Sequence, residues 1–138
     1  MIDRYKKRLD KAKMEKSSYM SNAKWFKFFS AMQQVDTFLP ESQVKFLAND
    51  ERTYLFCFGI DFDKKGILDG LACGPFNFND IEWIFIPAIQ EHERFNRKEK
   101  LQSFFEVVDL SIIENRLKQL GQYEFEIDEN GLKLYGYK

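Results

Sequence analysis

Residues 81–87 read Ile81-Glu-Trp-Ile-Phe-Ile-Pro87, and this stretch decides the fold. From Ile81 to Ile86 only Glu82 is polar, a pattern typical of a strand that is covered on both faces and is therefore central in its sheet. Pro87 has no backbone N–H to give to a sheet ladder, so it ends the strand. The rest of the chain is expected to fold around this strand.

Shorter strands are predicted before it. Gln43–Ala48 and Tyr54–Phe62 are apolar runs rich in β-forming residues, separated by the turn-like Asn49-Asp50-Glu51. The composition of Asp63-Lys64-Lys65-Gly66 predicts a further turn, after which a third strand returns at Ile67–Cys73. These runs predict neighbouring antiparallel strands.

The C-terminus predicts a β-hairpin. Tyr123–Asp128 and Leu132–Tyr137 flank Asn130-Gly131, the dipeptide preferred in two-residue type I′ turns. With that loop, Ile127 opposes Leu134 and both side chains lie on the same face.

Helices are predicted between these strands. Ser21 is a suitable N-cap for a helix over Asn22–Gln34, whose apolar residues recur at helical spacing. The pattern becomes helical again from Asn96, and Ser111-Ile-Ile-Glu114 is a capping-box signature that restarts a helix ending at Gly121. The residues expected on the buried helix faces are Trp25, Phe28, Phe29, Met32, Leu101, Phe104, Phe105, Val108, Ile113, Leu117 and Leu120.

The predicted fold class is α+β, an antiparallel sheet of about five to six strands with about three helices packed on it. The 138 residues suit one domain, expected over residues 21–138 after a basic, helical or frayed arm over residues 1–20. Cys57 and Cys73 are expected as buried, reduced strand residues. No signal-peptide core and no apolar run of about 18 residues occurs, so a cytoplasmic location is expected.

The net charge of −1 conceals an uneven distribution. Residues 1–16 carry seven basic and three acidic side chains, whereas residues 50–93 carry nine acidic and three basic ones. Aromatic residues interleave with the acidic stretch, and acidic groups around aromatic rings suit a surface that binds a cationic protein. The residues proposed for partner binding are Asp61, Asp63, Asp69, Asp80, Glu82, Trp83 and Phe76.

Catalytic and metal motifs are weak. The segment from Asp61 to Gly66 resembles the start of a calcium loop, but its fifth position is Lys65 and its twelfth is Ala72, so a hairpin turn is expected there. His92 is the single histidine and is expected to be a solvated loop or helix residue. No phosphate-binding glycine motif is present. No cofactor and no metal site is therefore expected.

The segments Asn22-Ala-Lys-Trp25, Ile81–Pro87 and Leu134-Tyr-Gly-Tyr137 together resemble a small, poorly characterised bacterial family of single-domain α+β proteins, over residues 21–138. In size, acidity, aromatic content and lack of a catalytic set, the chain is also similar to immunity proteins that neutralise bacterial toxins, including those of contact-dependent inhibition. This resemblance implies tight binding of a basic toxin domain, often a nuclease.

The leading hypothesis is a non-enzymatic, cytoplasmic binder of this immunity type. A second hypothesis is a nucleic-acid-associated accessory protein that binds phosphates through the basic arm and stacks bases on Tyr5 and Tyr19. A third is a hydrolase that uses paired carboxylates, for example Asp80 and Glu82 two apart on one strand face.

Overall fold

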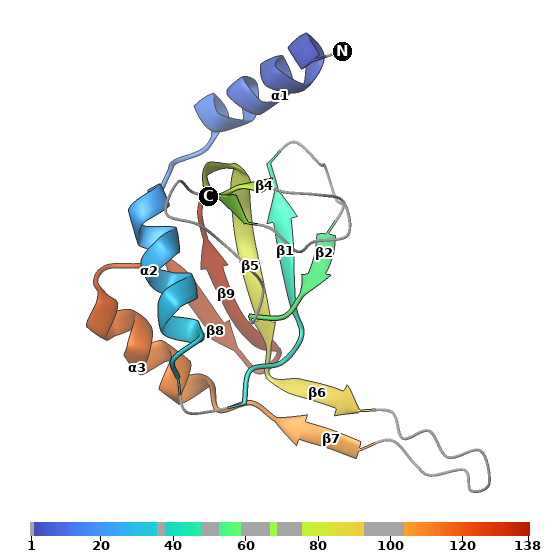
Figure 1. Ribbon diagram of the computed structural model, residues 1–138, viewed down its shortest axis with the longest axis vertical. Coiled ribbons are helices and arrows are strands. Elements are labelled where there is room, and N and C mark those ends of the chain that lie inside the picture. Colours follow the sequence, from blue (N-terminus) through green and yellow to red (C-terminus); the bar gives the residue numbers. More distant parts are fainter. Residues whose placement is uncertain (1, 36–37, 48–52, 59–66, 69–75, 93–103) are drawn as a thin grey trace, which may run out of the picture.

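The structure of the chain is a computed structural model, and it describes residues 2–35, 38–47, 53–58, 67–68, 76–92 and 104–138. Within these residues the fold consists of three α-helices, one five-stranded sheet and two two-stranded ribbons (Figure 1). In chain order the elements are α1 (Ile2–Glu15), α2 (Asn22–Met32), β1 (Ser42–Phe46), β2 (Thr53–Phe56), β3 (Ile67–Leu68), β4 (Phe76–Asn77), the 3₁₀ turn η1 (Phe78–Asp80), β5 (Ile81–Pro87), β6 (Ile89–His92), β7 (Phe104–Val107), α3 (Leu110–Leu120), β8 (Phe125–Asp128) and β9 (Gly131–Tyr135).

The main sheet is antiparallel and has the strand order β2-β1-β5-β9-β8, which makes β5 its central strand. Ile84 of β5 lies opposite Val44 of β1 on one side and opposite Leu134 of β9 on the other, and all three side chains are fully buried. The predictions of an α+β fold and of a central strand are confirmed. Trp83 and Phe85 are only partly buried, so β5 is fully covered on one face rather than on both.

Helices α2 and α3 lie side by side and cover one face of this sheet (Figure 1). The Ser21 side chain caps α2 as predicted, accepting a hydrogen bond from the Lys24 backbone N–H at 3.2 Å. The buried side chains of α2 and α3 form a single core with the inward-facing residues of the sheet, and burial of each large side chain stabilises the fold by roughly 1.5–3 kcal/mol. The buried helix residues are Trp25, Phe28, Phe29, Ala31, Met32, Ile113 and Leu117.

The strands before β5 differ from their predicted extents. β2 ends at Phe56, and Cys57 follows it as an exposed residue, so the expectation of a buried strand cysteine is wrong at this position. β3 pairs with β4 in a separate ribbon, whereas the sequence predicted that it would return beside β2. The predicted strand residues 69–73, the turn at residues 63–66 and Cys73 lie outside the described residues.

The C-terminal hairpin forms from β8 and β9, but its register differs from the prediction by two residues. Asp128 opposes Gly131 and Ile127 opposes Leu132, so the loop is Glu129-Asn130 rather than Asn130-Gly131. The Asp128 carboxylate accepts hydrogen bonds from the backbone N–H groups of Asn130 (2.8 Å) and Gly131 (3.2 Å), which stabilises the turn at Glu129-Asn130. Because the shift is even, the inward-facing side chains keep their face.

The helix predicted from Asn96 is wrong where the structure describes it, because Phe104–Val107 is β7 and pairs with β6. Helix α3 starts one residue before Ser111, and its N-cap is Asp109, whose carboxylate accepts the Ser111 backbone N–H at 3.1 Å. The predicted helix end at Gly121 is confirmed.

Helix α1 projects away from the main sheet, whereas α2 and α3 cover one of its faces (Figure 1). The segment that follows α1 is attached to the end of the chain. Ser17 and Lys138 exchange two backbone hydrogen bonds, of 3.1 and 3.0 Å, and Tyr19 N–H donates to the Gly136 carbonyl at 2.9 Å. These backbone contacts begin four residues before Ser21, where the sequence placed the start of the domain.

We expect Gly131→Ala to lower the free energy of unfolding by about 3–5 kcal/mol. A Cβ at this position would lie 2.2 Å from the Ile86 carbonyl oxygen, and the backbone φ of +157° disfavours side chains. Gly121→Ala is the matched control, because its φ is +148° but the nearest atom to its Cβ lies 3.9 Å away. The control should cost only about 1–2 kcal/mol. Urea denaturation measures both, and equal losses would contradict a steric role for Gly131.

Candidate functional site

The seven residues proposed for partner binding do not form one described surface. Asp61, Asp63 and Asp69 lie outside the described residues, so their place in a binding site stays a prediction. Phe76 belongs to β4, but the structure does not describe its side chain. Trp83 is partly buried on the sheet face away from α2 and α3. The remaining two, both carboxylates, are described in full.

Asp80 and Glu82 are buried, which corrects the expectation that they lie on an open acidic surface. Each residue keeps only 6% of its surface exposed. Asp80 ends η1 and is not a strand residue, so the prediction that the two carboxylates share one face of a single strand is wrong. Removing a charge from water costs several kcal/mol, and buried carboxylates therefore require compensating partners.

Lysines supply this compensation, and two of them come from the N-terminal segment. Lys13 Nζ, near the end of α1, lies 3.4 Å from Asp80 Oδ1, and Lys16 Nζ lies 2.6 Å from Glu82 Oε1. Lys45 of β1 pairs with the second carboxylate oxygen of Glu82. Two cations of the predicted basic arm thus neutralise two carboxylates of the acidic stretch within the same chain.

The position of Glu82 follows from a β-bulge. The register between β1 and β5 shifts at this point, which leaves Glu82 as the extra residue of β5. Its backbone carbonyl accepts two hydrogen bonds, from the N–H groups of Gly136 (2.7 Å) and Tyr137 (3.0 Å). The bulge therefore fixes the backbone of Glu82 and holds its side chain within reach of Lys45.

Glu82 has a lowered pKa. Burial raises the pKa of this carboxyl group, but the hydrogen bonds and positive charges of Lys16 and Lys45 together lower it by more. Glu82 therefore remains ionised at a more acidic pH than an ordinary glutamate. A carboxylic acid that donates a proton near neutral pH needs a raised pKa instead, so the geometry here does not favour the carboxylate-hydrolase hypothesis.

The face of the main sheet that lies away from α2 and α3 carries aromatic rings that contact lysine side chains. Lys133 Nζ lies 4.4 Å from the centre of the Trp83 ring and 5.3 Å from the centre of the Tyr135 ring, within the range of cation–π contacts. Trp83, proposed as an anchor for a partner, is thus already covered in part by a side chain of β9.

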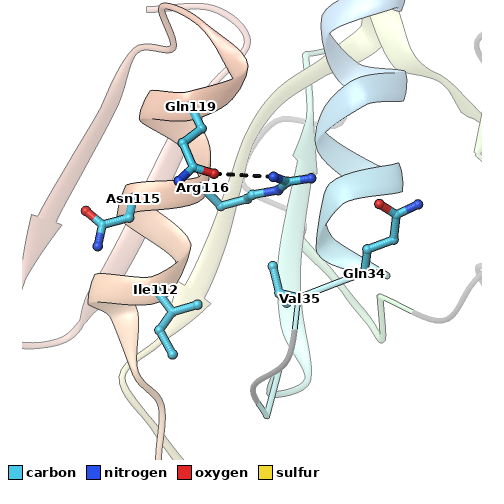
Figure 2. Close-up of a pocket in the computed structure, with 6 residues that line it drawn as sticks. All are labelled: Gln34, Val35, Ile112, Asn115, Arg116 and Gln119. Carbon is cyan, nitrogen blue, oxygen red and sulfur yellow. Dashed lines mark hydrogen bonds between the residues drawn. The ribbon is translucent and has the colours of Figure 1, made fainter.

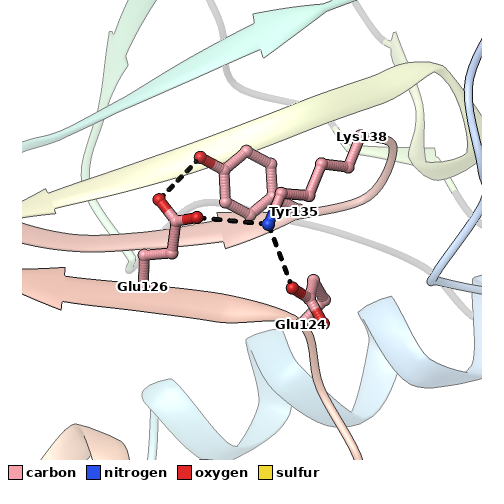
Figure 3. Close-up of polar contacts among 4 residues, drawn as sticks. All are labelled: Glu124, Glu126, Tyr135 and Lys138. Carbon is pink, nitrogen blue, oxygen red and sulfur yellow. Dashed lines mark hydrogen bonds and ion pairs between the residues drawn. The ribbon is translucent and has the colours of Figure 1, made fainter.

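Figure 3 shows a polar cluster beside these rings, at the end of the chain. Lys138 Nζ lies between two carboxylates, 3.2 Å from Glu124 and 3.1 Å from Glu126. The Tyr135 hydroxyl donates to the second oxygen of Glu126 at 3.1 Å. These contacts lower the pKa of Glu126, chiefly through the Lys138 hydrogen bond. Lys138 is thus shared by two carboxylates, so the cluster keeps an excess of negative charge.

A different surface is open to a partner. The β6–β7 ribbon projects from the main sheet (Figure 1), with Ile89 opposite Val107 and Glu91 opposite Phe105, so these four side chains share one face. The three apolar residues are largely exposed: 52% for Ile89, 66% for Phe105 and 74% for Val107. We call these three residues the ribbon face.

Sequence reasoning missed the ribbon face because helical spacing dominated the reading of the segment before α3. The alternation in Phe105-Glu106-Val107 was the signal that could have found it.

His92, expected in a loop or helix, ends β6, and its side chain is not described. Among the described residues, no group of three His, Cys, Asp or Glu side chains could hold a metal ion. None of the described helices is both long enough and apolar enough to cross a lipid bilayer.

We expect Glu82→Gln to lower the free energy of unfolding at pH 7 by about 1–3 kcal/mol, because two lysines would lose their counter-charge. A folded-state pKa below the ordinary value of 4.5 stabilises the protein above about pH 4.5, and this contribution is lost as the pH falls through the lowered pKa. The difference between wild type and variant should therefore shrink in acid.

Urea denaturation from pH 3 to pH 7 checks this dependence, with the pH series spanning roughly the carboxylate range. Glu126→Gln is the control, because Glu126 also has two polar partners but is exposed, and its effect should be smaller. A Glu82→Gln effect that is constant with pH would contradict the ionic role.

Comparison with known proteins identifies one protein family. A family model described as "Family of unknown function (DUF6678)" matches residues 9–138, which includes the second half of α1 and the whole of the described sheet. No curated protein and no solved structure matches the chain. The chain belongs to the DUF6678 family, whose function is unknown.

Proposed function

We propose that this chain is a non-enzymatic protein-binding module that contacts its partner through the ribbon face. The observation that carries the proposal is the exposure of three large apolar side chains on the same face of a projecting ribbon. Adjacent exposed apolar residues on a folded domain are characteristic of interaction sites. A two-stranded ribbon is only marginally stable by itself, so a partner that covers this face would also stabilise the ribbon.

The partner is proposed to be basic. Glu91 lies opposite Phe105 on the same face of the ribbon and is exposed, so a carboxylate adjoins the three apolar side chains. A protein that presents lysine or arginine around an apolar contact would match this arrangement and would associate faster for it. A basic toxin domain, as implied by the resemblance to immunity proteins, fits this description, with the cytoplasm as the proposed site of action.

Affinity purification of the tagged chain from its native host at low salt tests the proposal. We expect a basic protein to co-purify and to be identified by mass spectrometry. The purified partner should bind Phe105→Thr or Val107→Thr at least about tenfold more weakly than wild type, because threonine keeps β-propensity but removes most of the apolar contact. Neutralisation is then scored by co-expressing the partner with wild type or with either variant.

Leu55→Thr is the matched control. Leu55 is 59% exposed on β2 and away from the ribbon, so its replacement should leave binding unchanged. A partner that binds all three variants like wild type would remove the ribbon face from the proposal. An acidic partner, or repeated failure to recover any basic protein, would count against the immunity-type function.

A nucleic-acid-binding role is the second candidate, favoured by the projection of α1 from the domain (Figure 1). Lys13 of α1 and Lys16 just after it face the domain in ion pairs, whereas Arg4, Lys6 and Lys7 of α1 are exposed. Exposed cations along a helix can contact phosphates and release counterions.

For this role we expect a salt-sensitive shift of DNA or RNA by the full chain at about 50 mM salt. Replacing Arg4, Lys6 and Lys7 with glutamine should reduce the slope of log affinity against log salt by up to about three. These three substitutions keep the Lys13 and Lys16 ion pairs intact, whereas deletion of the whole arm would remove both pairs. Absence of any shift for the wild-type chain would reject the role, and Lys118→Gln serves as the control for a single surface charge.

A further inference from the structure

A groove runs between α2 and α3 on the side of the helices away from the sheet. Two adjoining hollows, of about 400 and 220 Å³, share Gln34 and Arg116 in their walls, and so form one continuous depression. Figure 2 shows the larger hollow, with the Arg116 side chain extending from α3 toward α2. The remaining residues that line the two hollows are Val35, Ile112, Asn115 and Gln119 in the larger, and Phe26, Lys27, Ser30, Ala31 and Leu120 in the smaller.

The groove combines an apolar lining with positive charge. Phe26, Val35 and Leu120 are partly buried apolar residues that pack against the core, and Ile112 is 37% exposed. Arg116 and Lys27 are the charged side chains among the described residues that line it, and none of those residues is acidic. An apolar surface with two cations and no opposing carboxylate is electrostatically complementary to an acidic ligand.

Arg116 has donors to spare for such a ligand. In the described part of the chain its one hydrogen bond goes to the neighbouring Gln119 side chain, at 3.3 Å, and this bond uses a single guanidinium nitrogen. A guanidinium has five N–H donors arranged to bind a carboxylate through two parallel bonds. Gln34, on the α2 side of the same hollow, has a carboxamide that can accept or donate further hydrogen bonds, whereas the Asn115 carboxamide points away from α2 (Figure 2).

We propose that the α2–α3 groove binds an acidic, amphipathic segment of a partner protein. Apolar side chains of that segment would occupy the two hollows, and a carboxylate would bind Arg116 where the hollows meet. The groove follows α2 from Phe26 to Ala31, a length of about 8 Å at 1.5 Å per residue, and continues past the end of the helix to Gln34 and Val35, which leaves room for about two turns of a bound helix. This surface is separate from the ribbon face and requires the opposite charge in its ligand.

Selection from a random 16-residue peptide library displayed on phage tests this inference, with the immobilised wild-type chain as target and Arg116→Gln for counter-selection. We expect enriched sequences to combine Asp or Glu with apolar residues at helical spacing. A synthetic enriched peptide, measured by fluorescence anisotropy, should bind Arg116→Gln about tenfold more weakly than wild type. Lys27→Gln, at the other end of the groove, should also weaken binding.

Lys118→Gln is the charge-matched control, because Lys118 lies on the same helix, pairs with Glu114 and does not line the groove. It should change the affinity less than about twofold. Lack of enrichment, enrichment of basic peptides, or equal binding to Arg116→Gln would overturn the inference. So would self-association of the chain that is lost in Arg116→Gln, since the occupant would then be a second copy. Phe105→Thr should bind the peptide like wild type, whatever the outcome for the ribbon face.

Discussion

The close approach of β9 to β5 is the contact on which the rest of the structure depends. A Cβ at Gly131 would lie 2.2 Å from the Ile86 carbonyl oxygen, and a Cβ at Gly136 would lie 2.3 Å from that of Ile81. Glycine at both ends of this contact lets the two backbones pair from Trp83 to Pro87 of β5. That pairing brings Leu132 and Leu134 under α2 and α3, so the core on the helix side is complete only with the last strand of the chain.

The bulge at Glu82 connects the C-terminus and the segment after α1 to this sheet. Its carbonyl receives the backbone of residues 136 and 137, and its carboxylate receives Lys16 and Lys45. The segment that follows α1 then pairs with Lys138, so residues 17–19 and the C-terminus meet at one end of β5. Removing one charge from a buried cluster leaves the others uncompensated, whereas exposed pairs such as Lys11–Glu15 contribute little. The buried cluster of Glu82, Lys16 and Lys45 therefore contributes more to the structure than the exposed ion pairs do.

The sequence correctly predicted the elements that depend on interactions between residues close together in the chain. The Ser21 cap, the end of α3 at Gly121 and the central strand all follow from residue type and periodicity, and all are confirmed. The hairpin register was wrong because Asn130-Gly131 satisfies the rules of a type I′ turn, whereas the tertiary contact at Ile86 requires the glycine one step inside the strand. The segment at Phe105 fits both helical and strand spacing, and only its pairing with Glu91 decides between them.

Charge along the sequence was a poor guide to charge on the surface for a related reason. The acidic stretch and the basic arm were treated as separate features in the sequence. In the fold, Lys13 pairs with Asp80 and Lys16 pairs with Glu82, so these four charges are already compensated within the chain. Two surfaces that remain open are distinguished instead by exposed apolar side chains: the ribbon face lies beside Glu91, and the α2–α3 groove lies around Arg116. Two apolar surfaces with opposite charge would exclude each other's ligands, since like charges at a desolvated contact cost several kcal/mol. Under the two proposals above, a chain of nearly neutral net charge would in this way distinguish two partners.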